Sequence, residues 1–312
     1  MSVRWDILGL GAAAVDDLLY VDRYPAPGSK VPIRARQREG GGLTATALVA
    51  ASRLGARTAY ASTLGDDELS RFTIQELERE GVDCAPVRTQ AGARPFHSMV
   101  IVDQSSGERT ILYSAEGVRG CHPEEITPEL IGSCRVLLVD HQSREAGLRA
   151  VELAQAASIP VVVDVEQENA PGAVELMRRA DHLIVGTGLA GRFTGETQPE
   201  RMVQVLCEAG RTCCVVTAGD RGCWYAEDDK MVHHFPAFKV EVVDTTGCGD
   251  VFHGAYAACI AQGERILTAI QVATASAALK ATQPGGRRGI PDRLAVDRFL
   301  QGECQEPSLS NR

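Results

Sequence analysis

The segment that most constrains the fold reads Val243-Asp-Thr-Thr-Gly-Cys-Gly-Asp-Val-Phe-His-Gly254, and a helical pattern of small residues follows it. Where small residues enter a helix, backbone N–H groups are left unpaired and the helix dipole favours an anion. Gly247, Cys248 and Gly249 therefore predict a phosphate cradle, and Asp250 is placed to deprotonate a hydroxyl beside it. The alternative is an ordinary glycine-containing turn in which Asp250 only occupies the first helical turn.

Upstream of this segment, short β-branched or leucine-rich runs alternate with helical patterns, which indicates a parallel sheet covered by helices. The predicted strands are 6–10, 58–63, 136–139, 160–165, 182–185 and 213–217. Helical periodicity predicts two buried faces. They consist of Leu43, Ala47, Ala50 and Leu54, and of Met202, Val205, Leu206 and Ala209. We therefore expect one α/β domain over residues 1–312.

Two stretches, at about 17–38 and 94–115, break this rhythm and predict antiparallel strands. The second runs from Phe96 to Asp103, passes through a Ser-Ser-Gly turn and continues from Arg109. We expect both to form a small sheet that projects from the core as a lid. Because exposed strand edges tend to pair, the sequence also predicts a homodimer through this lid.

Composition narrows the classes of partner. The chain has 41 acidic and 32 basic residues, a net charge of −9, so no overall positive field attracts nucleic acid or an anionic membrane. No apolar run approaches the ~18 residues of a membrane span, and the N-terminus lacks a signal peptide's apolar core. Ten cysteines without CxxC pairs indicate reduced, mostly buried thiols. We expect a soluble cytoplasmic protein.

The segment at 243–254 resembles the C-terminal signature of the PfkB (ribokinase-like) carbohydrate kinases, usually written D-T-x-G-A-G-D, with Cys248 in place of the alanine. The resemblance extends over nearly the whole chain. It implies a ribokinase-like three-layer α/β/α core with a mostly parallel sheet and a small β-sheet lid. It also implies an ATP-dependent sugar kinase in which Asp250 is the catalytic base and Gly247, Cys248 and Gly249 form the anion hole.

Two N-terminal segments resemble the family's sugar site. The run Gly40-Gly41-Gly42-Leu-Thr-Ala-Thr46 is similar to its G-G-x-x-x-N pattern, with Thr46 keeping a hydroxyl but losing an amide's reach. The resemblance implies sugar contacts at Gly41, Gly42 and Thr46, and at Asp16 after the first strand. Its neighbour Asp17 is predicted to be a solvated charge. Without the resemblance, the glycines would be a turn and both aspartates surface charges.

A third segment, Thr217-Ala-Gly219-Asp-Arg-Gly222, resembles the family's T-x-G-x-x-G loop, although such a spacing alone is an ordinary loop. The resemblance implies nucleotide contacts at Thr217, Gly219 and Gly222. Thr245 and Gly285, in segments similar to the family's nucleotide-binding elements, are further candidates.

Cations are only partly defined by the sequence. Mg²⁺ is expected because it neutralises the phosphates of ATP. Gly186 and Leu189 replace the family's N-x-x-E, so the protein ligands of Mg²⁺ stay open, with Asp164 a weak candidate. Asp244, Thr246 and Gly285 fall where some members bind a monovalent cation, which leaves K⁺ open.

The sequence also resembles the sulfofructose kinase branch of the family, which phosphorylates a fructose-like ketose at its 1-hydroxyl. This resemblance narrows the class of sugar expected as the substrate. Gln142 and Tyr113 stand where that branch has its sulfonate-binding arginine and asparagine, so the charge-assisted contact is lost. We expect an uncharged or differently charged ketose, with Arg109 either an alternative anion contact or a paired lid charge. Two alternatives remain. One is a nucleoside kinase, in which Phe96 and Tyr113 would contact the nucleobase, and the other is a non-catalytic sugar or nucleotide sensor.

Two further residues are given structural roles. Asp66 or Asp67 is expected to cap the helix that follows it. His253, one turn beyond Asp250, is expected to be packed or hydrogen-bonded rather than catalytic.

Overall fold

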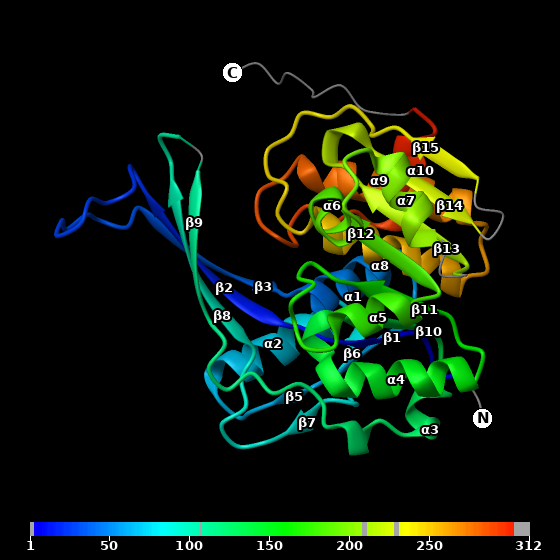
Figure 1. The fold of residues 1–312 in the computed structure, drawn as a ribbon. Helices are drawn as coiled ribbons and strands as arrows, with labels where there is room; N and C mark the ends of the chain where they lie inside the picture. The colour runs from blue at the N-terminus through cyan, green and yellow to red at the C-terminus, as the bar shows by residue number, and fades with distance from the viewer. Residues whose placement is uncertain (1–2, 107, 208–210, 228–230, 303–312) are drawn as a thin grey trace.

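The computed structural model describes residues 3–106, 108–207, 211–227 and 231–302. They form an α/β core of three layers, and a smaller sheet stands away from that core (Figure 1). This is the ribokinase-like architecture that the sequence predicts, with a mostly parallel central sheet between two layers of helices.

The central sheet has nine strands in the order β15-β14-β13-β12-β11-β10-β1-β4-β6. All neighbours from β13 to β6 are parallel, and β14 and β15 are antiparallel additions at one edge. In chain order the strands are β1 (Trp5–Leu10), β4 (Thr58–Ala61), β6 (Val82–Asp83), β10 (Cys134–Asp140), β11 (Val161–Asp164), β12 (His182–Gly186), β13 (Cys213–Thr217), β14 (Cys223–Glu227) and β15 (Val232–Phe235). The six strands predicted from the sequence all lie here, apart from the end of the second, which forms a separate short strand.

Helices cover both faces of this sheet. The first face carries α1 (Leu43–Arg53), α2 (Glu68–Arg79), α8 (Cys248–Ala261), α9 (Ile266–Ala281) and α10 (Arg293–Leu300). The second carries α3 (Pro128–Ile131), α4 (Arg144–Ala156), α5 (Ala173–Arg179), α6 (Thr187–Thr194) and α7 (Pro199–Cys207). Short 3₁₀ turns occur at Pro123–Glu125, His141–Ser143 and Gly219–Arg221.

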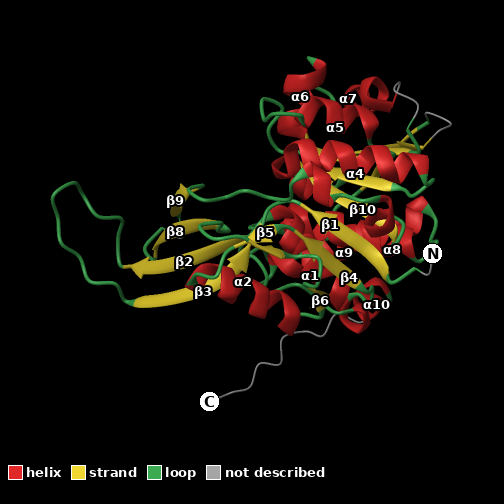
Figure 2. Cartoon of the chain, turned by 90° about the horizontal axis from the view of Figure 1, so that it is seen from below, coloured by secondary structure: helices red, strands yellow, loops and turns green. Residues whose placement is uncertain are grey.

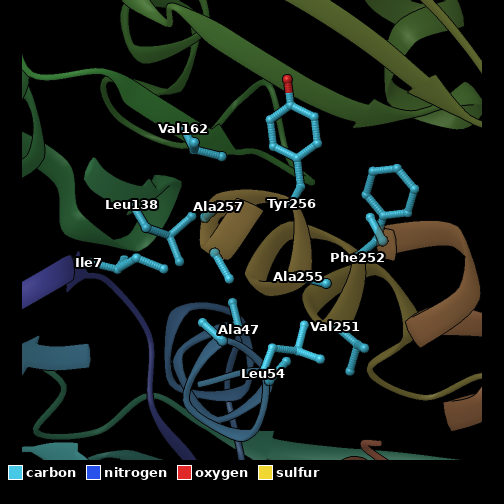
Figure 3. Packing of buried hydrophobic residues seen from close by; sticks show 14 of the residues in the cluster. Ile7, Ala47, Leu54, Leu138, Val162, Val251, Phe252, Ala255, Tyr256 and Ala257 are labelled. Atoms are coloured by element: carbon cyan, nitrogen blue, oxygen red, sulfur yellow. The ribbon is translucent and has the colours of Figure 1, made fainter. Parts of the chain in front are cut away.

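The two layers are built by the alternation of side chains along each strand. In β10, Leu138 packs into the first layer, whereas Leu137 packs into the second. Figure 3 shows Leu138 approaching Ala257 of α8. A Cβ at Gly254 would overlap the backbone of Ala47, so glycine lets α8 lie close to α1. This close packing fixes the position of the N-terminus of α8.

Of the two predicted helical faces, one is confirmed and one is partly wrong. In and just after α1, Ala47, Ala50 and Leu54 are buried. In α7, Val205 is 40% exposed, because the buried stripe runs through Met202, Val203 and Leu206 instead. Ala209 lies outside the described residues.

The second sheet has the order β3-β2-β8-β9 and projects from the core as a lid (Figure 2). Its strands are β2 (Ala14–Val21), β3 (Ala35–Gly41), β8 (Phe96–Asp103) and β9 (Arg109–Ser114). Two antiparallel hairpins, β2-β3 and β8-β9, join through the parallel pair β2-β8. Residues 31–34 were expected in a strand but lie in a loop, because Pro25, Pro27 and Pro32 interrupt pairing and β3 begins only at Ala35.

Several smaller features complete the fold. β5 (Thr63–Leu64) pairs with β7 (Arg88–Thr89), and Asp67 caps α2 by accepting a hydrogen bond from Ser70 N at 2.8 Å, as predicted. Seven of the nine described cysteines are buried. None of the described helices combines the length and apolarity needed to cross a lipid bilayer.

Candidate active site

The turn before α8 requires its glycines for different reasons. Gly247 has φ 76°, and a Cβ there would lie 2.7 Å from the carbonyl oxygen of Gly286, so the turn is closed by packing. A Cβ at Gly249 would meet no atom within 4 Å, so that side of the turn is open. Cys248 N donates to Thr245 O at 3.2 Å, whereas the N–H groups of Gly249 and Asp250 have no acceptor in a helix start. The turn therefore presents backbone donors to an open side.

Asp250 lies in the first turn of α8 and is partly buried. Burial, together with the negative charges of Asp164 and Glu166, raises its pKa well above the ordinary value. Asp164 is buried at the end of β11, and burial likewise raises its pKa. A carboxylate with a raised pKa is a better proton acceptor than a solvated one, provided that it is ionised.

Asp140, to which the sequence analysis gave no role, ties together the loops that form the site. One oxygen, Oδ2, accepts hydrogen bonds from Ala12 N at 2.7 Å and Thr44 Oγ1 at 2.8 Å, and Oδ1 accepts from Gln142 N at 2.7 Å. These donors come from the loop after β1, the start of α1 and the turn after β10. Asp140 is fully buried, so it fixes three segments at the carboxyl ends of the parallel strands.

The predicted sugar residues lie together where the lid joins the core. A Cβ at Gly41 would overlap the carboxylate of Asp16, which also hydrogen-bonds Ser98. Gly42 has φ 91°, and a Cβ there would lie 2.6 Å from Ala12 O. Burial raises the pKa of Asp16. These contacts bring the base of the lid and the start of α1 into one surface.

Arg287 is a site residue that the sequence analysis missed. Its Nη2 donates to Gly41 O at 2.6 Å and its Nε to Thr46 Oγ1 at 3.1 Å, and only 8% of the residue is exposed. Burial lowers its pKa to about 10, while the carboxylates of Asp16 and Asp250 favour its charge. Thr46 is 1% exposed, so the structure shows its hydroxyl holding Arg287. The sequence signal that could have identified Arg287 as a site residue is its position within a glycine-rich loop.

Asp17 was predicted to be solvated, and that prediction is wrong. It is fully buried and accepts hydrogen bonds from Arg38 Nε at 2.9 Å and Arg36 Nη2 at 3.1 Å, with His97 Nε2 at 2.9 Å. These partners, Arg38 foremost, hold its pKa well below the ordinary range. Because neighbouring residues of a strand face opposite sides, Asp17 joins an ion-pair network of the lid while Asp16 faces the site.

The predicted nucleotide residues follow β13. Thr217 ends that strand and donates to Val185 O at 3.4 Å, and Gly219 has φ 60° with open space around its Cβ direction. Gly222 differs, because a Cβ there would lie 2.6 Å from Ala237 N, so its glycine serves backbone packing. Thr245 is exposed beside the turn before α8. Gly285 is buried near it.

Asp244 connects the lid to that turn. Arg109 of β9 donates to its Oδ1, and Gly285 N donates to its Oδ2 at 2.9 Å. Of the two roles expected for Arg109, the structure therefore shows the paired lid charge. A cavity of about 730 Å³ lies between β9 and residues 242–245.

Three other candidates take structural positions. Gln142 is half-buried, with its Nε2 3.1 Å from His141 Nε2, and lines a small cavity with Phe96 at the base of the lid. Leu189 is buried in the second helical layer, so it supplies no metal ligand. His253 lies 2.9 Å from Gly249 O through Nδ1, as a hydrogen-bonded histidine, which confirms its predicted role. Among the described residues, no three His, Cys, Asp or Glu side chains converge as a metal-binding group.

Known proteins share this fold and this sequence pattern. A profile of the pfkB family carbohydrate kinases matches residues 6–293. The chain belongs to the pfkB family. It is 30% identical over 289 residues to fructokinase-1 of Oryza sativa subsp. japonica, which covers 84% of this chain and 88% of that protein. It is 25% identical to the ribokinase of Haemophilus influenzae, over 96% of this chain and 99% of that one.

Solved structures agree with the sequence comparison. The ribokinase of Thermotoga maritima superposes with a TM-score of 0.82 at 26% identity, covering 96% of this chain and all of that one. The ribokinase of Arabidopsis thaliana, solved with ribose and ATP, has the same fold at 21% identity and a TM-score of 0.82. This pfkB-family protein is thus an ATP-dependent phosphotransferase that acts on a carbohydrate.

Proposed function

We propose that this kinase transfers the γ-phosphoryl group of ATP to a hydroxyl of a ketose, with Asp250 as the base. The observation that carries the proposal is the position of Asp250. It follows the open turn at Gly249, and burial and neighbouring carboxylates raise its pKa. A hydroxyl bound beside it can lose its proton to the carboxylate as its oxygen attacks phosphorus.

The surrounding residues supply charge stabilisation and orientation. The N–H groups of Gly249 and Asp250 and the positive end of the α8 dipole face the developing negative charge on the transferred group. Asp16 and the backbone at Gly41 and Gly42 orient the sugar hydroxyls. The positive charge of Arg287 opposes the rise in the pKa of both Asp16 and Asp250, and so favours their ionised forms.

For the metal, Asp164 and Glu166 are the fitting donors. Their carboxylates lie near Asp250 and raise its pKa, so an excess of negative charge gathers where the nucleotide phosphates are proposed to bind. Mg²⁺ is commonly held by one or two carboxylates together with substrate phosphates. We propose that Asp164 and Glu166 hold the Mg²⁺ of the nucleotide, which would neutralise phosphate charge when bound. Thr217 and Gly219 would contact the phosphates.

A ketose is favoured by two observations. The rice relative with 30% identity carries the name fructokinase, although ribokinases are also among the relatives. Gln142 offers a neutral amide at the base of the lid, which suits an uncharged sugar better than a sulfonate. A nucleoside is disfavoured, because Tyr113 is 71% exposed on β9 and does not form an aromatic clamp with Phe96.

A coupled ADP-release assay against ketoses, aldoses and nucleosides tests this proposal. We expect turnover with at least one ketose, and a loss of at least ~100-fold in Asp250→Asn, as for removal of a positioned base. Asp66→Asn, which changes an exposed carboxylate far from the turn, is the matched control and should keep the wild-type rate. Sugar-dependent turnover that survives in Asp250→Asn would contradict the mechanism, and activity with nucleosides alone would contradict the substrate class.

We also propose a cytoplasmic homodimer that pairs through the lid. Supporting this, β9 is an edge strand on which Ile111, Leu112 and Tyr113 are 54%, 56% and 71% exposed. An apolar edge of this kind is covered in most soluble proteins. Analytical ultracentrifugation should give the mass of two chains, and Ile111→Lys should shift it toward one. A single monomeric species for the unmodified protein would contradict the dimer.

A further inference from the structure

Lys280 is a buried cation that the mechanism above does not use. It lies in the last turn of α9, is 0% exposed, and donates from Nζ to Asp244 O at 2.8 Å. Burial lowers its pKa, while Cys248, Asp244 and Glu39 favour the charged form. A lysine is rarely fully buried unless a partner holds it, so this position needs an explanation.

Lys280 contacts Asp244, which is one of the three residues, with Thr246 and Gly285, where the family resemblance leaves a monovalent cation open. Asp244 Oδ1 accepts from Thr246 N at 2.8 Å, from Thr246 Oγ1 at 2.7 Å and from Arg109. Asp244 Oδ2 accepts from Gly285 N at 2.9 Å, and the carbonyl oxygen is held by Lys280. These groups do not fit a K⁺ ion, because Oδ1 already has three donors and the carbonyl oxygen is held by a fixed positive charge.

Repulsion between positive charges also disfavours a K⁺ ion beside Asp244. A second unit charge about 4 Å from the Lys280 ammonium would be bound roughly 1,000-fold more weakly in a medium typical of protein sites. Arg109 adds another positive charge at the Asp244 carboxylate. Both positive charges belong to side chains of the protein, so Asp244 needs no counter-ion from solution.

We propose that the Lys280 ammonium is a built-in cation that makes this kinase independent of monovalent ions. It holds Asp244 O against the end of α9, where Val243 N and Asp244 N also donate to Ala281 O at 2.8 and 3.1 Å. The segment so fixed leads directly into the turn at Gly247. Lys280 is thus a positioning residue for the anion hole, and the inference rests on the role proposed for that turn.

The first experiment compares KCl with tetramethylammonium chloride at equal ionic strength. The rate of ADP release and the melting temperature of the unmodified protein should be the same in both salts. A rate or melting temperature that rises specifically with K⁺ would overturn the proposal. The melting temperature needs no substrate, so it tests the inference even if no sugar is turned over and the proposed function fails.

The second experiment removes the ammonium. Lys280→Met keeps most of the buried volume without the charge and should lose ~100-fold in kcat/KM, as for the loss of one anion-hole element. Lys30→Met, at an exposed lysine of the lid loop, is the matched control and should keep the wild-type value. Wild-type kcat/KM in Lys280→Met without K⁺ would overturn the proposal.

A third variant separates a cation site from mere packing. Lys280→Ala opens space beside Asp244 O, into which K⁺ or methylammonium can enter. We expect its rate and its melting temperature to rise with either cation but not with tetramethylammonium, which is too large. A Lys280→Ala protein that responds equally to all three salts would show that the charge has no specific role, and would overturn the proposal.

Discussion

Asp17 in the lid and Asp250 at the start of α8 are carboxylates removed from free solvent, and their surroundings are opposite. Asp17 is surrounded by donors from Arg36, Arg38 and His97, which hold its pKa well below the ordinary range. Asp250 instead faces other carboxylates, and burial and their charges raise its pKa. The ion pairs of Asp17 stabilise the folded lid. The surroundings of Asp250 destabilise the fold but raise the basicity of its carboxylate.

The difference teaches how this kinase separates structure from chemistry. A charge whose hydrogen-bonding capacity is filled by fixed partners cannot take a proton from a substrate, but it can rigidify the element that carries it. A charge held among like charges is costly for stability and reactive for the same reason. The following predictions test whether the two aspartates differ in this way.

The largest expected effect on stability is at Asp17. Asp17→Asn keeps the shape but removes the buried carboxylate that accepts from Arg36 and Arg38, and Arg38 keeps only its pair with Glu68, so the free energy of unfolding should fall by about 2 kcal/mol. Because the folded pKa is depressed, this stabilisation is present above the unfolded pKa of ~3.9 and is lost as the pH falls toward the folded value. Urea denaturation at pH 7 and pH 2 measures the stability above and below the unfolded pKa.

Asp22→Asn is the matched control for that experiment. Asp22 pairs with Arg34 through three hydrogen bonds, but both side chains are exposed. An exposed pair contributes little to stability, so this variant should keep the wild-type denaturation midpoint. Equal effects of the two substitutions would show that burial of Asp17 has no energetic consequence.

A smaller effect of opposite sign is expected at Asp250. Its folded pKa is raised, so the ionised carboxylate weakens the folded state as the pH rises above the unfolded pKa of ~3.9. Asp250→Asn should therefore stabilise the protein at pH 7 by about 1 kcal/mol, a rise of roughly 2 °C in Tm, while abolishing most activity. Calorimetry at pH 7 and pH 4 measures this stabilisation, and the rise in Tm caused by Asp250→Asn should be smaller at pH 4. A destabilised Asp250→Asn protein would mean that the carboxylate is satisfied by partners, like Asp17.

The smallest expected effect is a shift in the acidic limb of the pH–rate profile, which is the pH range in which activity is lost on acidification. The rate should fall as the pH drops through the raised pKa of Asp250, since the protonated acid accepts no proton. Glu166→Gln removes one of the charges that raise this pKa, so at a Mg²⁺ concentration that keeps the nucleotide complexed the acidic limb of kcat/KM for the sugar should move to lower pH. Glu168→Gln is the control, because Glu168 pairs with Arg192 at 2.7 Å and does not act on Asp250. An unmoved limb in Glu166→Gln would contradict this electrostatic account.

The sequence predicted the parts of the fold that depend on local pattern. Apolar runs located the parallel strands, and small residues at 247–249 located the open turn before α8. Both signals act over a few residues, so they can be recognised without knowing the tertiary structure. Asp67 was recognised as a helix cap for the same reason.

Residues whose role depends on distant partners were missed. Arg287 holds Thr46, 241 positions away, and Asp140 joins Ala12 across 128 positions. Lys280 meets Asp244 only because α9 returns beside the turn, although a single lysine at the end of a helix of small apolar residues was a visible anomaly. Asp17 was misjudged because spacing does not tell which of two adjacent aspartates the lid will cover.

The most direct test of the account is a crystal structure with a ketose and a non-hydrolysable ATP analogue. We predict that the accepting sugar hydroxyl lies within hydrogen-bond distance of an Asp250 carboxylate oxygen, about 2.6–3.2 Å, with the terminal phosphate against the amides of Gly249 and Asp250. A complex in which the sugar hydroxyl is bonded elsewhere and the terminal phosphate lies away from that turn would contradict it.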